Sequence, residues 1–352
     1  MKRAERTKEI QEFIIESLEK NNNNIVAEVA KKFNISRQAI NRHLKKMVAA
    51  GILFSEGTTR NKNYWPKQFI SEKYEFDLND DFLKDQYYGN YDENKVWMLL
   101  IAPLLKNIPK NIYAICQYGF AEMLNNVFDH SNASKVTISL EHNAAAVSLV
   151  IMDEGVGIFN KIQQECNLKD KRLAMLELAK GKFTTDPNRH TGEGIFFSSR
   201  MFDTFIIESE NLRYIHFKAG EEWLVEKTPI ISKGTIIYMR INPNSKRTTI
   251  EIFDKFASDL EDYGFTKTKV PVALAKYGDE NLISRSQAKR LLARFDRFKE
   301  VILDFKDIES IGPAFADEIF RVFVNEHPDV KSTFINANDN VTKMIIKAKK
   351  YR

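Results

Sequence analysis

The first 66 residues alternate short apolar stretches with polar breaks. Apolar residues at helical spacing predict helices over 7–20 and 25–33. A third helix is predicted over 36–51, with a serine in its N-cap position and a glycine where it ends. Residues 52–66 predict two short strands around a polar, basic tip. The pattern therefore favours three helices followed by a β-hairpin.

The third predicted helix has an apolar face and a polar face. The polar face carries Arg37, Gln38, Asn41, Arg42, Lys45 and Lys46, and the hairpin tip adds Arg60 and Lys62. Arg, Gln and Asn pair with base edges in the major groove, whereas Lys contacts phosphates. Residues 7–66 resemble the winged helix-turn-helix domains of bacterial regulators, which implies binding to double-stranded DNA. A helical bundle that binds no nucleic acid is the alternative.

Past this hairpin the periodicity weakens before it returns. Residues 66–92 are acidic and aromatic, and we expect a linker or strap there, with packing on a neighbouring subunit as one option. A helical pattern then begins at Glu93, is broken at Pro109 and ends near Asp129, after which strands alternate with polar turns. From residue 270 the repeated order of strand and helix predicts a small parallel sheet.

These patterns predict a multidomain α+β protein. A length of 352 residues is enough for two or three domains. We expect the boundaries to fall at 1–66 for a DNA-binding head, 67–94 for an acidic linker or strap, 95–265 for a central domain and 266–352 for a C-terminal domain.

The composition excludes several classes of protein. With 43% hydrophobic and 29% charged residues, the chain is not collagen-like, disordered or a disulfide scaffold. No apolar stretch reaches the roughly 20 residues of a membrane-spanning helix, and the N-terminus has no signal-peptide core. The two cysteines, Cys116 and Cys166, are far apart, so neither a disulfide framework nor a cysteine zinc site is indicated. We therefore expect a cytoplasmic protein with no membrane partner.

The net charge of +5 combines segments of opposite sign. Residues 1–65 are basic, residues 71–95 are acidic, and residues 331–352 are basic again. Such asymmetry indicates modules with different partners, and the basic head is the candidate for nucleic acid. For the basic C-terminal helix, a solvated face is expected rather than a second nucleic-acid site.

Glycine is scarce, with 14 residues in the chain, but several of them cluster between positions 155 and 194. Three motifs surround this cluster: Glu122, Asn126 and Asp129 on one helical face, Asp153-Glu-Gly155-Val-Gly157-Ile158 after an apolar strand, and Thr191-Gly192-Glu-Gly194-Ile195 at the start of a helix. A carboxylate and a carboxamide can hold Mg²⁺ together with phosphate oxygens. Glycines let a ligand ring lie against the backbone, and a helix N-terminus favours an anion.

In this order, the motifs resemble the GHKL ATP-binding fold of histidine kinases, gyrase, MutL and the anti-sigma-factor serine kinases, over about residues 95–262. The resemblance implies an α/β sandwich in which helices cover one face of a mixed sheet, with ATP and Mg²⁺ as cofactors. It implies that Asn126 ligates the Mg²⁺ and that Glu122 orients or deprotonates the attacking water or hydroxyl. Asp129 would be a supporting polar group behind the ligand or on its adenine side.

The resemblance also implies an adenine site. Asp153 would accept the adenine amino proton, Gly157 would leave room for the ring, and Thr235 would complete the contact through water. Gly155 and Ile158 belong to the same nucleotide-binding motif.

The phosphate side of the site follows in the same way. Gly192 and Gly194 would cradle the phosphates, and Ile195 stands where leucine is usual. Residues 159–190 would form a lid over the nucleotide. The lid side chains that could reach the phosphates, with no choice made among them, are Lys180, Lys182, Arg189 and His190.

The C-terminal segment from Val270 resembles a STAS domain, the small partner of anti-sigma-factor kinases. Residues 301–323 match its strand, loop and helix, in which a serine that caps the helix is the usual phosphoacceptor. Here Gly312-Pro313-Ala314 takes that place, and Ser310 lies earlier in the loop. An unmodified docking module is therefore favoured over a phosphorylated one.

We expect an ATP-binding, DNA-binding transcriptional regulator that forms a homodimer, with ATP hydrolysis left open. A histidine kinase is disfavoured because no histidine lies between His43 and His130 to accept phosphate on a preceding helix. The alternative is a serine/threonine kinase that acts on a separate STAS-type partner with Glu122 as base. An ATP-driven clamp is disfavoured because no transducer domain follows the central domain.

Overall fold

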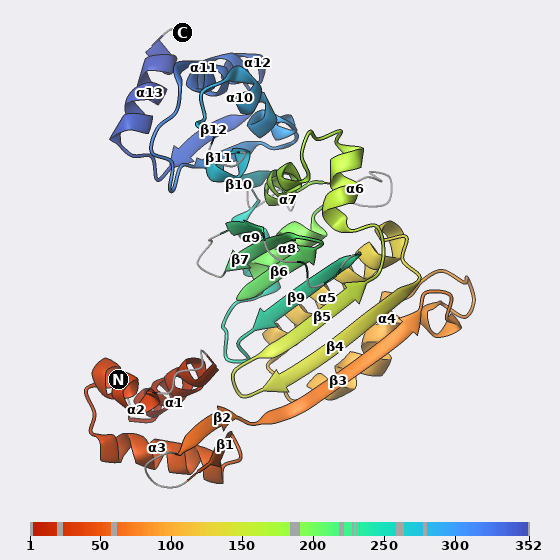
Figure 1. Cartoon of the computed structure of the whole chain (residues 1–352), viewed down its shortest axis with the longest axis vertical. Helices are drawn as coiled ribbons and strands as arrows, with labels where there is room; N and C mark the ends of the chain where they lie inside the picture. Colours follow the sequence, from red (N-terminus) through yellow and green to blue (C-terminus); the bar gives the residue numbers. More distant parts are fainter. Residues whose placement is uncertain are drawn as a thin grey trace.

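The computed structural model describes residues 3–19, 24–57, 62–183, 191–217, 222–226, 229, 231, 233–257, 264–276 and 280–350. The N-terminal helices lie at one end of the long axis, a large sheet in the middle and the C-terminal domain at the other end (Figure 1). The predicted multidomain α+β class is confirmed. Among the described helices, none has the length and apolarity needed to cross a membrane.

The head contains the predicted helices and hairpin. They are α1 (Arg3–Glu19), α2 (Ile25–Phe33), α3 (Arg37–Ala49), β1 (Leu53–Glu56) and β2 (Asn63–Pro66). Ser36 is the N-cap of α3, where its hydroxyl accepts a hydrogen bond from Ala39 N at 3.2 Å. The apolar faces of the helices meet in a core separate from that of the rest of the chain.

The central sheet has the described strand order β3-β4-β5-β9-β6-β7-β8. The strands are β3 (Gln68–Asp77), β4 (Lys135–Asn143), β5 (Val147–Asp153), β6 (Thr204–Ser209), β7 (Leu212–Phe217), β8 (Glu222–Glu226) and β9 (Thr235–Ile241). Each described pair of neighbours is antiparallel, which refines the expectation of a mixed sheet. The helical crossover from β5 to β6 favours parallel pairing, but β9 lies between these two strands and pairs with both.

β3 corrects the expectation of a linker or strap. Residues 68–77 form the edge strand of the central sheet and pair with β4. Ile70, Tyr74 and Phe76 pack against the core, while the residues between them are exposed. The charged residues that obscure this alternation suit an edge strand, because they discourage pairing with another chain.

Helices cover one face of the central sheet. α5 (Lys110–His130) packs against β5 and β9, and α8 (Gly194–Met201) packs against β6 and β7. α9 (Thr249–Lys255) contacts both helices. Burial alternates along β5 and β9, so one face of each strand meets the helices and the other face is partly exposed. The irregular helical segment that precedes α5 begins with α4 (Glu93–Val96).

The C-terminal domain contains the predicted parallel sheet. Its strands pair in the order β10 (Lys267–Pro271), β11 (Glu300–Asp304) and β12 (Lys331–Ile335). The helices are α10 (Arg285–Leu292), α11 (Pro313–Asp317), α12 (Val324–Glu326) and α13 (Asp339–Lys350). Gly312 is the N-cap of α11, where no side chain makes a cap hydrogen bond, and Ser310 is exposed.

The head is joined to the central sheet in two ways. Only Lys67 separates β2 from β3, so the wing strand continues almost directly into the edge of the sheet. In addition, Ala145 in the turn between β4 and β5 is 2% exposed and belongs to the core of the head. The head is therefore in direct contact with the sheet rather than tethered by a linker.

The C-terminal domain meets the central domain at α7 (Ala174–Lys180), which follows α6 (Ile158–Glu165) and contacts β10. Aromatic rings continue the contact: Phe265 lies 4.3 Å from Phe196 and 5.3 Å from Phe298, measured between ring centroids. The two domains share one continuous apolar cluster.

Candidate functional site

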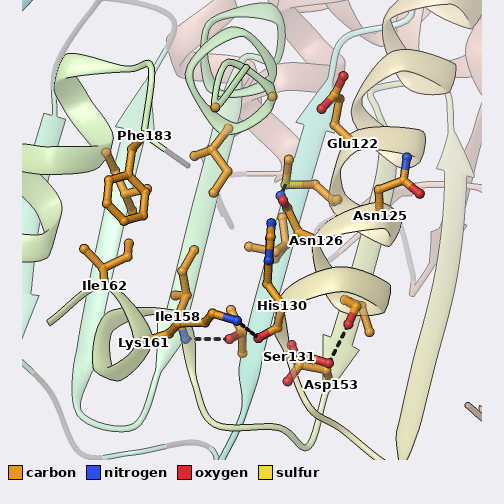
Figure 2. Close-up of a pocket in the computed structure, with 18 of the residues that line it drawn as sticks. Glu122, Asn125, Asn126, His130, Ser131, Asp153, Ile158, Lys161, Ile162 and Phe183 are labelled. Atoms are coloured by element: carbon orange, nitrogen blue, oxygen red, sulfur yellow. Dashed lines mark hydrogen bonds between the residues drawn. The ribbon is translucent and has the colours of Figure 1, made fainter. Parts of the chain in front are cut away.

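A cavity of about 300 Å³ opens beside α5, at the end of β5. This volume is at the lower end of the range for small-molecule sites, roughly 300–1,000 Å³. Asn126 and His130 extend into it from α5, and Ile162 and Phe183 lie on its opposite side (Figure 2). The predicted site residues that line it are Glu122, Asn126, Asp153, Gly157, Ile158, Gly192, Gly194, Ile195 and Thr235.

Asp153 is a buried acceptor at the floor of the cavity, with 5% of its surface exposed. Its Oδ1 accepts a hydrogen bond from Gly155 N at 2.7 Å. Burial raises the pKa of the Asp153 carboxyl, whereas hydrogen bonds from Gly155 and Thr235 oppose the rise. Thr235 is itself held in place, because its Oγ1 accepts a hydrogen bond from Ile158 N at 3.0 Å.

The two glycines after Asp153 have different roles. Gly157 lines the cavity with φ of +81°, and a Cβ there would lie 2.5 Å from Ser209 Oγ. Gly155 does not line the cavity: a Cβ at this position would lie 2.0 Å from the Ser131 backbone oxygen. Gly155 therefore allows the loop to pack against the end of α5, and its part in nucleotide binding stays a prediction.

Glu122 and Asn126 reach the cavity from one face of α5. The Glu122 carboxylate lies beside the start of α8, where a Cβ on Gly194 would be 2.1 Å from its Oε2. Its carboxylate also hydrogen-bonds Tyr118; burial, the Glu122 charge and this bond raise the pKa of the tyrosine hydroxyl. Asn126 Nδ2 donates to Met123 Sδ at 3.9 Å, and within the described chain no hydrogen bond reaches its Oδ1.

Asp129 is exposed and is not among the lining residues, so its role as a supporting polar group stays a prediction. At the last turn of α5 the cavity faces His130 and Ser131 instead. Sequence reasoning missed His130, although it follows Asn126 by four residues and so continues one helical face. It also missed Lys161, whose Nζ donates to the His130 backbone oxygen at 3.0 Å.

Two of the four lid side chains that the sequence offers as candidates for the phosphates point elsewhere. Lys180 Nζ donates to the backbone oxygens of Arg290 and Ala293. Lys182 Nζ donates to the Arg297 backbone oxygen at 2.8 Å. Both ammonium groups are therefore directed at the C-terminal domain, whose contact with the lid the sequence does not reveal. The other two candidates, Arg189 and His190, lie outside the described residues.

The phosphate motif is shaped by close backbone packing. Gly192 has φ of +71°, and a Cβ there would lie 2.4 Å from the Phe183 backbone. Phe183 N donates to the Gly192 backbone oxygen at 3.1 Å, which brings both ends of the intervening segment together at the cavity. Only glycine fits this close approach.

The cavity fits a nucleotide on two observations. Asp153 is a buried acceptor beside glycines that leave the backbone open, and Asn126 Oδ1 is available to a ligand. Within the described part of the chain, no three His, Cys, Asp or Glu side chains gather as a metal site. A cation here would therefore depend on ligand oxygens as well as on the protein.

The expected DNA-reading residues share the exposed face of α3: Arg37, Gln38, Asn41, Arg42, Lys45 and Lys46. The opposite face is buried in the core of the head. On the hairpin, Lys62 is exposed, with its Nζ 5.7 Å from the Tyr64 ring centroid. Arg60 lies outside the described residues.

Comparison with known protein families agrees with these three units. Residues 9–53 match winged helix-turn-helix DNA-binding domains, residues 103–215 match histidine kinase-like ATPase domains, and residues 287–342 match a STAS-like domain of unknown function. No curated protein matches the chain. The ATPase domain implies nucleotide binding, and the first domain implies DNA binding. Three separate stretches of the chain are therefore similar, in order, to a winged helix-turn-helix DNA-binding domain, a histidine kinase-like ATPase domain and a STAS-like domain.

Proposed function

We propose that this protein is a transcriptional regulator in which binding of ATP with Mg²⁺ to the central domain controls the DNA affinity of the head. The observation that carries the proposal is the course of β5. This strand begins beside the turn that contributes Ala145 to the core of the head and ends at Asp153 in the cavity. A single strand of seven residues therefore joins the cavity to the turn that packs in the head.

In this proposal, different residues of the cavity bind different parts of the ligand. Asp153 and Thr235 hold the adenine, Gly157 leaves room for the ring, and Asn126 ligates the Mg²⁺. When bound, the cation neutralises phosphate charge. Gly192 and Gly194 offer backbone N–H groups to the phosphates at the start of α8.

On the DNA, α3 occupies the major groove. Arg37, Gln38, Asn41 and Arg42 read base edges, and Lys45, Lys46, Arg60 and Lys62 contact phosphates. Winged heads commonly bind paired half-sites, so the proposed active form is a homodimer. The protein has one state that binds DNA and one that does not, and ATP favours the state that binds the nucleotide more tightly. The size of this shift depends on how much the two states differ in nucleotide affinity.

The test measures DNA affinity with and without MgATP, using a duplex selected from a random pool by the wild-type protein. Because binding depends on salt, the ionic strength is held constant. An Asp153→Asn variant should lose the nucleotide effect while it keeps its nucleotide-free affinity. Glu154→Gln is the matched control, because Glu154 is the exposed neighbouring carboxylate and does not line the cavity. Equal affinity with and without nucleotide, together with an unchanged oligomeric state, would remove the proposal.

A second function, protein serine/threonine kinase, is favoured by Glu122, a carboxylate that lines the cavity and would act as the general base. Gly312, Pro313 and Ala314 provide no hydroxyl in the STAS-like domain, so the acceptor would be on a separate partner. Incubation with γ-labelled ATP and candidate STAS-type proteins tests this function. Glu122→Gln should abolish transfer, and full transfer by this variant would exclude Glu122 as the base.

A further inference from the structure

One short helix is both a wall of the cavity and a contact with the STAS-like domain. All of α7 is buried. Leu178, and Phe183 just beyond the helix, line the cavity. Glu177 and Lys180 bind groups of the STAS-like domain. Any interaction that holds Glu177 and Lys180 in place therefore also holds the two side chains that line the cavity.

Lys180 is fully buried at this contact. Its Nζ donates to Glu177 Oε1 at 2.8 Å and to the backbone oxygens of Arg290 and Ala293 at 3.0 and 3.1 Å. In the opposite direction, Thr268 Oγ1 donates to the Lys180 backbone oxygen at 2.7 Å. All three donors of the ammonium have acceptors, as a buried charge requires.

Arg294 binds the same helix from the STAS-like domain. Its guanidinium contacts Glu177 Oε2 through Nε at 2.9 Å and through Nη2 at 2.6 Å. Further N–H groups donate to the backbone oxygens of Glu177, Gly181 and Lys182 at 3.0, 3.3 and 2.9 Å. The last carbonyls of a helix lack helical partners, so Arg294 caps the end of α7. A lysine cannot reproduce this forked arrangement.

Arg294 also has a backbone conformation that is rare for residues other than glycine. Its φ of +67° is in the left-handed region, which is unfavourable for a residue with a side chain. Such a conformation persists where the surroundings hold it in place. Here they do, because the side chain is 17% exposed and bound to α7 on several atoms. Arg294 is therefore unlike a solvated surface arginine.

The same contact extends to the residue that enters the cavity. Arg297 Nη1 donates to the Lys182 backbone oxygen at 3.3 Å, and the Lys182 Nζ returns a hydrogen bond to the Arg297 backbone oxygen. The next residue is Phe183, and the Arg294 guanidinium lies 5.2 Å from its ring centroid. The STAS-like domain thus fixes the chain from Glu177 to Phe183.

We propose that Arg294 is a positioning residue for nucleotide binding: it holds the cavity wall formed by Leu178 and Phe183, and so couples the STAS-like domain to nucleotide occupancy. This inference rests on the proposed binding of ATP by the cavity. A wall that is fixed before the ligand arrives need not be ordered during binding, which raises affinity. Coupling is reciprocal, so nucleotide must in turn strengthen the contact between α7 and the STAS-like domain.

The experiment compares MgADP affinity by calorimetry in the full-length wild type and three variants. Arg294→Ala should weaken binding roughly fivefold or more, within the usual range of coupling between sites. Arg294→Lys should fall between these values, because charge remains but the fork is lost. Arg321→Ala is the matched control: Arg321 forms a forked pair with Asp317 inside the STAS-like domain, at 2.5 and 2.8 Å. Its affinity should stay within about twofold of the wild type.

Hydrogen exchange of the wild-type protein gives a second readout that needs no variant. Backbone amides in residues 285–297 should exchange more slowly when MgADP is bound, although these residues do not line the cavity. Unchanged exchange there, or equal affinities for Arg294→Ala and Arg321→Ala in folded proteins, would overturn the coupling. If Arg294→Ala does not fold, the exchange result decides. A wild-type protein that binds no nucleotide would instead overturn the proposed function, and the coupling with it.

Discussion

Two features of the backbone favour glycine at Gly157, and substitution with alanine, which adds one methyl group, tests both. An alanine at this position must adopt φ of +81°, and its Cβ must also lie 2.5 Å from the buried Ser209 Oγ. We expect Gly157→Ala to destabilise the central domain by roughly 1–3 kcal/mol and to weaken nucleotide binding. Thermal unfolding and calorimetric titration measure the two effects.

Gly89 supplies the control for this substitution. Its φ of +70° is similar, but a Cβ there has nothing within 4 Å. Gly89→Ala should therefore show the backbone cost alone, roughly 1 kcal/mol, with unchanged nucleotide affinity. Similar losses of nucleotide affinity in both variants would contradict the assignment of Gly157 to the cavity.

Lys180 predicts a pH dependence. Burial lowers the pKa of its ammonium from 10.5 to about 8, although Glu177 opposes the shift. Between these two values the unfolded chain binds a proton that the folded chain has lost, so stability rises as pH increases from 8 to 10.5. Lys180→Met should remove this part of the slope, as measured by urea unfolding at several pH values. Parallel slopes in the two proteins would contradict the prediction.

At the same scale, the sequence predicted residue positions better than side-chain directions. Helical spacing placed Glu122 and Asn126 at the cavity, but it did not reveal that the cavity is lined by His130 rather than Asp129 at the last turn of α5. Lys180 was one of four lid side chains that could reach the phosphates, with no choice made among them. Two of its three acceptors are backbone oxygens more than 100 residues later in the chain, and no local pattern reveals such a contact.

At the scale of single elements, α3 depends on its N-cap residue. Ser36 accepts the hydrogen bond from Ala39 N that begins the helix. Ser36→Ala should cost the head about 1 kcal/mol and lower its DNA affinity, because α3 carries the reading face. Ser36→Asn keeps a good cap and should retain both properties. Circular dichroism and binding to the selected duplex check this; equal losses in the two variants would rule out capping as the cause.

Elements with clear periodicity were predicted well, and the exception is informative. The head and the parallel strands of the C-terminal domain follow from apolar spacing and turn residues. β3 was missed because its alternation is interrupted by Glu72, where an edge strand tolerates charge. The strand order of the central sheet could not be predicted from local sequence patterns either. β9 follows β5 and β6 in the sequence but lies between them in the sheet.

At the scale of the whole molecule, the ATPase domain has a neighbour attached at each end. The head contacts the turn between β4 and β5, and the STAS-like domain holds α7. Both contacts are built from elements that also reach the cavity. The architecture therefore allows a nucleotide at one site to influence two partners of different chemistry, DNA at one end and protein at the other.

The single residue between β2 and β3 also determines which way the side chains of the wing face relative to the sheet. In an extended chain each residue advances about 3.3 Å and turns its side chain to the opposite face. One residue inserted after Lys67 would turn the wing over relative to the sheet, whereas two would restore its face. We expect the nucleotide effect on DNA affinity to be lost with one added residue and partly regained with two. Equal effects of the two insertions would show that the orientation of the wing relative to the sheet does not determine the nucleotide effect.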